Sequence, residues 1–97
     1  MKMRYTYVEE SPYNPGKWLI YFKNGLMPFE PCVGCRHVLG ARLMGLNYAD
    51  YLRLCRDEYG AEIQGKGQKY PTPYFTSEAS AERLAAQFEN RIYTLLN

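Results

Sequence analysis

The chain of 97 residues is 46% hydrophobic and 23% charged, a composition typical of one ordinary folded domain. This length excludes two-domain enzymes and barrels, because a second core would need more chain. Twelve basic against ten acidic residues give a net charge of +2, too small for a protein that coats nucleic acid by charge alone.

The same features bear on the compartment and on assembly. No apolar run approaches the roughly 20 residues that cross a bilayer, and no apolar region of a secretory signal follows the first residues. We therefore expect a cytoplasmic protein that contacts no membrane. A domain this small buries a thin core, so a homodimer is one way to gain stability.

The first quarter of the chain predicts an antiparallel hairpin. Residues 4–9 and 17–23 are rich in aromatic and β-branched types, which favour strands. Between them Pro12, Pro15 and Gly16 interrupt any ladder, so we expect a wide loop at this point.

The centre predicts a pair of helices. Residues 36–44 carry apolar side chains at helical spacing, although Gly40 costs about 1 kcal/mol of helix propensity relative to alanine. The second helix, over 48–59, is bounded by Asn47 as N-cap and by Gly60 after its last turn. Its apolar stripe consists of Tyr48, Tyr51, Leu52, Cys55 and Tyr59, and another face carries Ala49, Arg53 and Arg56.

A second hairpin and a long helix complete the chain. Residues 61–64 and 69–75 flank a glycine-containing turn, and Pro71 and Pro73 cannot donate ladder hydrogen bonds, so we expect the later strand at a sheet edge or only partly paired. Ser77 can cap the last helix. The buried face of that helix is predicted to comprise Ala81, Leu84, Ala85, Phe88, Ile92 and Leu95.

These elements together predict one α+β domain over residues 1–97. Its antiparallel hairpins and central helical pair would be joined by a C-terminal amphipathic helix packed on the sheet.

The spacing of small, glycine and capping residues in the segment 41–69 suggests a function for the helical pair. Ala41 is followed four residues later by Gly45, then by an apolar residue and by the capping residue Asn47. A small residue lets two helices approach, and glycine accepts the left-handed turn between them. This spacing resembles the helix-turn-helix of DNA-binding proteins, and the hairpin with Lys66 at its tip resembles the wing of winged-helix proteins.

The resemblance implies a non-catalytic, nucleic-acid-binding regulator. Arginine and asparagine side chains read base edges, and lysines and other arginines contact phosphates. The candidate residues for binding nucleic acid or another ligand are Arg36, Arg42, Asn47, Tyr48, Arg53, Arg56, Lys66 and Lys69. The hypothesis requires Arg53 and Arg56 to be free of the chain's own carboxylates. The plain alternative is a corner of two packed helices with solvated arginines.

The aromatic residues suggest a second function. Ten tyrosines are present, and four aromatic residues lie in or near proline-containing loops, namely Tyr13, Trp18, Tyr70 and Tyr74. Such rings can form a protein hot spot or stack on a base, and packing at sheet edges is the plain alternative. In size and composition the chain is similar to small orphan proteins of phages and other mobile elements. The alternative function is therefore an inhibitor that binds a host defence protein or its nucleotide signal.

The cysteines and the single histidine are candidates for a metal site or for catalysis. Cys32, Cys35, His37 and Cys55 are ligand types that a structural zinc prefers, but only one close-spaced pair is present. We therefore expect free thiols, no metal and no cofactor. Cys35 and His37 are too close in sequence to act well as nucleophile and base, so we expect no enzyme.

Overall fold

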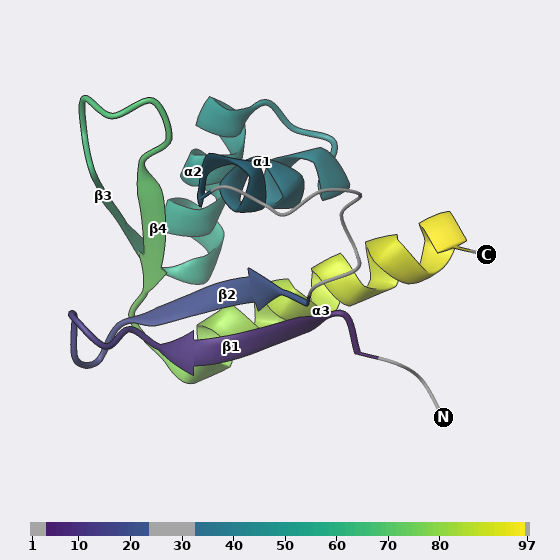
Figure 1. Ribbon diagram of the computed structural model, residues 1–97, viewed down its shortest axis with the longest axis horizontal. Coiled ribbons are helices and arrows are strands. Elements are labelled where there is room, and N and C mark those ends of the chain that lie inside the picture. Colours follow the sequence, from purple (N-terminus) through teal and green to yellow (C-terminus); the bar gives the residue numbers. More distant parts are fainter. Residues whose placement is uncertain (1–3, 24–32, 97) are drawn as a thin grey trace.

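The computed structural model describes residues 4–23 and 33–96, without the side chains of 33–37 and 96. Figure 1 shows the elements in their arrangement. In chain order they are β1 (Thr6–Glu10), β2 (Trp18–Phe22), α1 (Val33–Leu43), α2 (Tyr48–Tyr59), β3 (Ala61–Gln64), β4 (Thr72–Phe75) and α3 (Glu78–Leu96). The fold is a single α+β domain, as predicted.

The four strands form one antiparallel sheet in the order β1-β2-β4-β3. β1 pairs with β2 from Thr6↔Phe22 to Glu10↔Trp18, and β3 pairs with β4 along its whole length. Between the two hairpins, Trp18 and Phe75 are the only partners among the residues that the structure describes. The sequence predicted β4 either at a sheet edge or only partly paired. The structure confirms partial pairing, because β4 pairs with β2 at one position, and it shows that β4 lies inside the sheet and not at its edge.

Each hairpin has its own helix. α3 packs on β1 and β2, as predicted for the C-terminal helix, and α2 packs on β3 and β4 (Figure 1). Phe88 of α3 is fully buried and joins the two halves, because its ring lies 5.3 Å from that of Phe22 and 6.3 Å from that of Tyr51. The core therefore depends on one helix that touches both hairpins.

The start of β1 is held by a carboxylate from far along the chain. The Glu89 side chain on α3 accepts hydrogen bonds from the backbone N–H of Tyr5 at 2.6 Å and of Thr6 at 2.8 Å, and from Thr6 Oγ1 at 3.1 Å. Thr6 is fully buried, and these bonds satisfy its polar groups. Glu89 thus fastens an edge strand to the helix beneath it.

Gly40 lets α1 lie close to the core. A Cβ atom at this position would approach the Tyr51 hydroxyl oxygen to 2.7 Å and Phe88 Cζ to 3.1 Å. Both aromatic side chains are buried, so neither can swing aside. The lower helix propensity of glycine is therefore offset by this contact between α1 and the two rings.

Three details differ from the sequence predictions. Leu95 was expected on the buried face of α3, but 74% of it is exposed because the last turn of α3 extends beyond the sheet. β4 begins at Thr72 instead of residue 69, so the connection from β3 is longer than a tight turn. α1 begins at Val33, three residues earlier than predicted.

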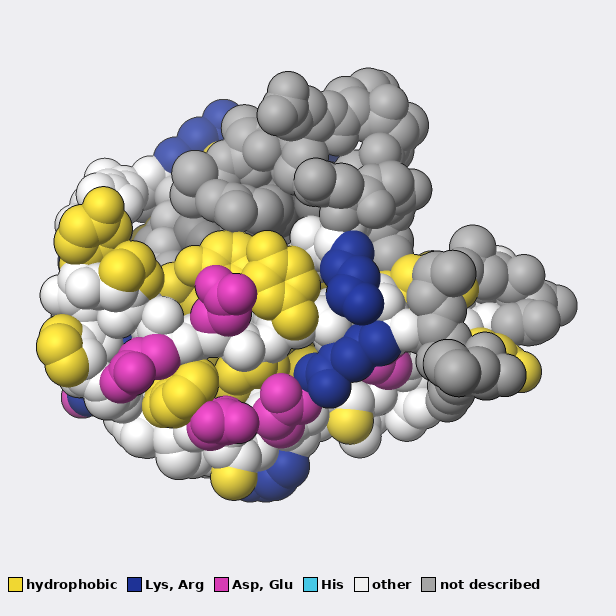
Figure 2. All heavy atoms as spheres, turned by 60° about the horizontal axis from the view of Figure 1, so that its bottom comes forward, with side chains coloured by type: hydrophobic (Ala, Val, Ile, Leu, Met, Phe, Trp, Pro, Cys, Tyr) yellow, Lys and Arg dark blue, Asp and Glu magenta, His cyan; other side chains and the backbone are white. Residues whose placement is uncertain are grey.

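The surface beside β1 and α3 is of mixed character. Figure 2 shows this side, where hydrophobic side chains lie among acidic and basic ones. Arg4 and Glu82 form an ion pair at 2.6 Å, and the rings of Tyr7 and Tyr21 stack with centroids 5.2 Å apart. No helix in the described part of the chain has the length and apolar character needed to span a membrane.

Candidate nucleic-acid interface

The helical pair has the turn that the sequence predicts. Gly45 adopts the left-handed conformation, with φ of 70°, directly between α1 and α2. Asn47 caps α2 by accepting a hydrogen bond from the Asp50 N–H at 2.8 Å, and Gly60 ends the helix with φ of 67°. Both predicted ends of α2 are confirmed, and this local geometry fixes where the helix begins.

The first residue of α2 is fastened to the hairpin that follows. The Tyr48 hydroxyl donates a 2.5 Å hydrogen bond to the Pro71 carbonyl oxygen, and its ring meets that of Tyr70 edge-on at 5.6 Å. Burial raises the pKa of Tyr48 well above its ordinary value, so the hydroxyl stays protonated and remains a donor. This contact makes the start of α2 and the base of the β3–β4 connection one surface.

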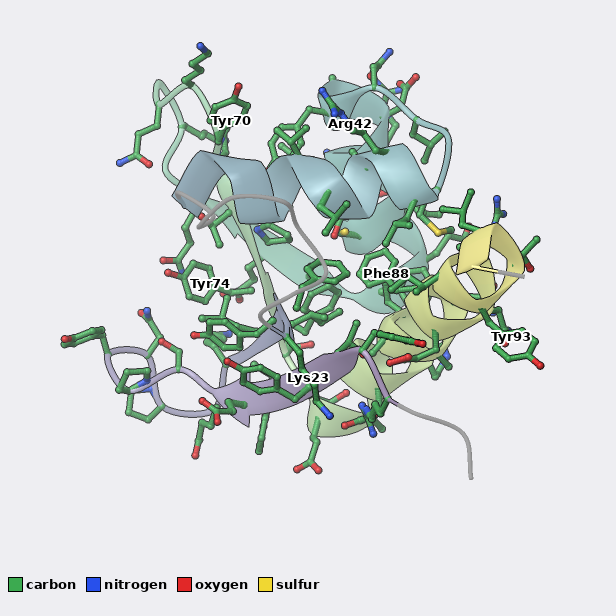
Figure 3. All side chains as sticks on the ribbon, turned by 45° about the vertical axis from the view of Figure 1, so that its right-hand side comes forward. Lys23, Arg42, Tyr70, Tyr74, Phe88 and Tyr93 are labelled. Carbon is green, nitrogen blue, oxygen red and sulfur yellow. The ribbon has the colours of Figure 1, made fainter. Side chains whose placement is uncertain are left out.

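We call this surface the helix–hairpin face and define it by Arg42, Asn47, Lys66, Lys69 and Tyr70. Arg42 and Tyr70 lie at the same end of the molecule, and Lys23 lies at the opposite end (Figure 3). Lys66 and Lys69 are exposed on the connection between β3 and β4.

Three cations of the helix–hairpin face are available to a ligand. Arg42, Lys66 and Lys69 are exposed, and none of them forms an ion pair with a carboxylate among the described residues. Lys69 Nζ lies 5.5 Å from the centroid of the Tyr70 ring, a weak cation–π contact that leaves its hydrogens free. Exposed cations of this kind suit phosphate groups.

The outward face of α2 is different, and it does not meet the requirement set by the sequence hypothesis. Arg53 contacts Asp50 at 3.1 Å, and Arg56 contacts Asp57 at 2.8 Å. The hydrogen bond with the Asp57 carboxylate raises the pKa of Arg56, and the same bond from the Arg56 guanidinium lowers the pKa of Asp57. Exposed pairs are weak, but they neutralise the charge that would attract phosphates or guanine edges. Arg53 and Arg56 are therefore not free base-reading groups.

Two other candidate residues, Asn47 and Tyr48, use their polar atoms within the protein. The Asn47 Oδ1 atom is used by the cap, and the Tyr48 hydroxyl is used by Pro71, so both residues build the face instead of offering their full hydrogen-bonding edge. Arg36 lies in α1, but its side chain is outside the described residues.

The four candidate aromatic residues do not form one surface. Tyr70 packs on Tyr48, as described above, whereas Tyr13 and Tyr74 line a hollow beside β2 and β4. Trp18 lies at the single pair that joins these strands. Tyr13 is the most exposed, at 90%. A shared aromatic hot spot of all four is thus not present, although the smaller set at the hollow is.

Among the candidate metal ligands, only the Cys55 side chain is described. It is fully buried on α2, and burial raises the pKa of its thiol to about 12, so it behaves as a small apolar group. Cys32 and the side chains of Cys35 and His37 lie outside the described residues. Within the described part, no three His, Cys, Asp or Glu side chains are grouped so as to hold a metal ion.

Two structural features had little signal in the sequence. The hydrogen bonds from the start of β1 to Glu89 join residues more than eighty positions apart, and no local sequence pattern predicts them. The opening between β2 and β4 had one signal, Pro73, whose missing N–H limits pairing.

Comparisons with protein-family models, curated proteins and solved structures find no match to this chain.

Proposed function

We propose that the protein binds duplex nucleic acid through the cations of the helix–hairpin face, without catalysis. This replaces the sequence hypothesis, which does not hold in its original form because Arg53 and Arg56 are paired with carboxylates. The carrying observation is the contact of Tyr48 with Pro71 and Tyr70, which holds the basic hairpin beside the start of α2. This contact supports a helix and a hairpin that meet the same stretch of duplex, as the winged-helix resemblance implies.

In this proposal Arg42, Lys66 and Lys69 contact phosphates. Phosphate contacts set the position of a protein on the duplex but carry no sequence information. Base reading requires free side chains on α2, and there Arg53 and Arg56 are already paired with carboxylates. We therefore propose binding through these three local phosphate contacts, with weak sequence preference, because the net charge of +2 is too small for binding by overall charge.

Fluorescence anisotropy with a labelled random duplex tests the proposal. Because three phosphates would be neutralised, the logarithm of the affinity should fall with the logarithm of salt concentration with a slope of about −2.7. Raising salt from about 50 to about 200 mM should then weaken binding about 40-fold. The combined variant Arg42→Ala, Lys66→Ala and Lys69→Ala should abolish binding at the higher salt concentration.

Two matched controls distinguish this face from general charge. The combined change Asp50→Asn, Arg53→Gln, Arg56→Gln and Asp57→Asn removes both ion pairs without altering the net charge, so it should change affinity by no more than about twofold. Lys23→Ala at the opposite end should also have little effect. Absence of binding at low salt, or equal loss in the Lys23 variant, would overturn the proposal. Absence of binding would favour the alternative of a mobile-element inhibitor that acts on a host protein or nucleotide signal.

A further inference from the structure

A hollow of about 390 Å³ lies where β2 and β4 diverge. This volume is within the range of small-molecule sites in proteins, about 300–1,000 Å³. The described lining comes from the loop after β1, from β2 and β4, and from one residue each of α2 and α3. The lining residues are Ser11, Pro12, Tyr13, Leu19, Ile20, Tyr21, Phe22, Tyr51, Thr72, Pro73, Tyr74, Phe75 and Phe88.

The hollow exists because the two central strands separate. They are partners only at Trp18↔Phe75, and Pro73 offers no N–H for a further bond to a neighbouring strand. Beyond that pair the sheet opens toward the core. Tyr51 and Phe88, which line the hollow, are themselves buried core residues with 5% and 0% exposure. Figure 3 labels Tyr74 and Phe88, two of the rings that line it.

The chemistry of the lining restricts the ligand. Aromatic rings dominate it, hydroxyl groups of Ser11, Thr72 and the tyrosines supply the polar atoms, and none of the described lining residues is charged. A charged ligand would lose hydration here without gaining a counter-charge, which is costly. A flat aromatic ligand would gain ring contacts with favourable offset or edge geometry.

We propose that this hollow, the β2–β4 pocket, binds a neutral, flat aromatic small molecule. Its volume of about 390 Å³ suits a single ring system and is too small for an extended peptide. Tyr13 lies at the pocket with 90% of its surface exposed and can cover a bound ring. This inference is independent of nucleic-acid binding, because it uses none of the free cations.

The single tryptophan provides a direct readout. Trp18 is the sheet partner of Phe75, which lines the pocket, and 2-naphthol, which is neutral at neutral pH, accepts energy from tryptophan emission. Titration with 2-naphthol should quench Trp18 emission in a saturable way. The matched probe 2-naphthalenesulfonate has the same rings and a negative charge, and it should bind at least about tenfold more weakly.

Variants locate the site. Thr72→Phe should fill the pocket and weaken 2-naphthol binding at least about tenfold, whereas the same change at Thr94, exposed on α3, should alter it by less than about twofold. Tyr13→Ala removes an exposed ring at no cost to the core and should weaken binding severalfold. This second variant decides the matter if circular dichroism shows that Thr72→Phe does not fold. Unsaturable quenching, equal binding of the sulfonate, or unchanged binding in a folded Thr72→Phe or in Tyr13→Ala would overturn the proposal.

Discussion

The two hairpins of the sheet differ in what holds them. The β1–β2 hairpin pairs over five positions, lies on α3, and has its first strand fastened by Glu89. The β3–β4 hairpin lies against α2, and Tyr48 holds it at Pro71, near the connection between its two strands. Within the described part of the sheet a single residue pair joins the hairpins, so their association depends on side chains in the core.

This difference separates the hairpin that stabilises the domain from the hairpin that carries the proposed binding surface. The first hairpin carries buried polar bonds and a covering helix, and the second carries exposed cations on a long connection. Surfaces that bind ligands are often drawn from segments that contribute less to the core, because their residues need not pack. The β2–β4 pocket lies between the two hairpins, and the helix–hairpin face includes the connection of the second hairpin.

Replacing the ring that joins the two halves should have the largest effect. Phe88→Ala removes a fully buried ring that lies near both Phe22 and Tyr51, and it should lower the free energy of unfolding by about 4 kcal/mol. Urea denaturation followed by circular dichroism should show one shifted transition. Gln87→Ala, at an exposed position on the same helix, serves as control. A loss below about 1 kcal/mol would show that the hairpins do not depend on this ring.

The next largest effect is expected where α1 meets the core. Gly40→Ala places a Cβ atom 2.7 Å from the Tyr51 hydroxyl oxygen, and the resulting strain should exceed the gain in helix propensity. We expect a net loss of about 2 kcal/mol in thermal or urea denaturation. Adding Tyr51→Phe removes the clashing oxygen and should recover part of that loss. A Gly40→Ala protein more stable than the original would contradict this account of the close approach.

Weakening the hydrogen bonds between Glu89 and the start of β1 should have a smaller, localised effect on stability. Glu89→Gln places an amide NH₂ where only acceptors fit, and it should cost about 1.5 kcal/mol. Hydrogen exchange of the Tyr5 and Thr6 amides should accelerate more than that of β3. Glu82→Gln, in an exposed ion pair with Arg4, should change stability by less than about 0.5 kcal/mol. Equal losses of stability in the two variants would show that the hydrogen bonds of Glu89 to Tyr5 and Thr6 do not stabilise β1.

Alkaline pH should have the smallest effect. Burial raises the pKa of Cys55 to about 12, whereas an unfolded thiol ionises near about pH 8.5. The neutral thiol is favoured in the folded state, so its contribution is complete below that pH and declines as pH rises. Between about pH 8 and pH 9.5 the protein should lose about 1 kcal/mol more stability than Cys55→Ala. Parallel pH profiles for the two proteins would refute this linkage.

The local elements were predictable because their signals lie within a few residues. The bounds of α2 follow from Asn47 and Gly60, and the turn before it follows from Gly45, since caps and left-handed glycines act on adjacent backbone groups. One of the two ion pairs of α2 was also predictable, because Asp50 precedes Arg53 by three residues and this spacing places both side chains on one face of a helix. Adjacent residues do not face each other on a helix, so the spacing of Arg56 and Asp57 did not predict their contact.

The sequence by itself determined the class of fold, the two hairpins, the ends of α2 and most of the buried face of α3. Only the tertiary structure decided that β4 lies inside the sheet, that Glu89 fastens β1, that Leu95 is exposed, and that the sheet opens above Phe88. The reason is physical. Caps, turns and side-chain periodicity act over one or two turns of chain, whereas strand order, the partners of a distant carboxylate and an opening between strands depend on how all the elements pack at once.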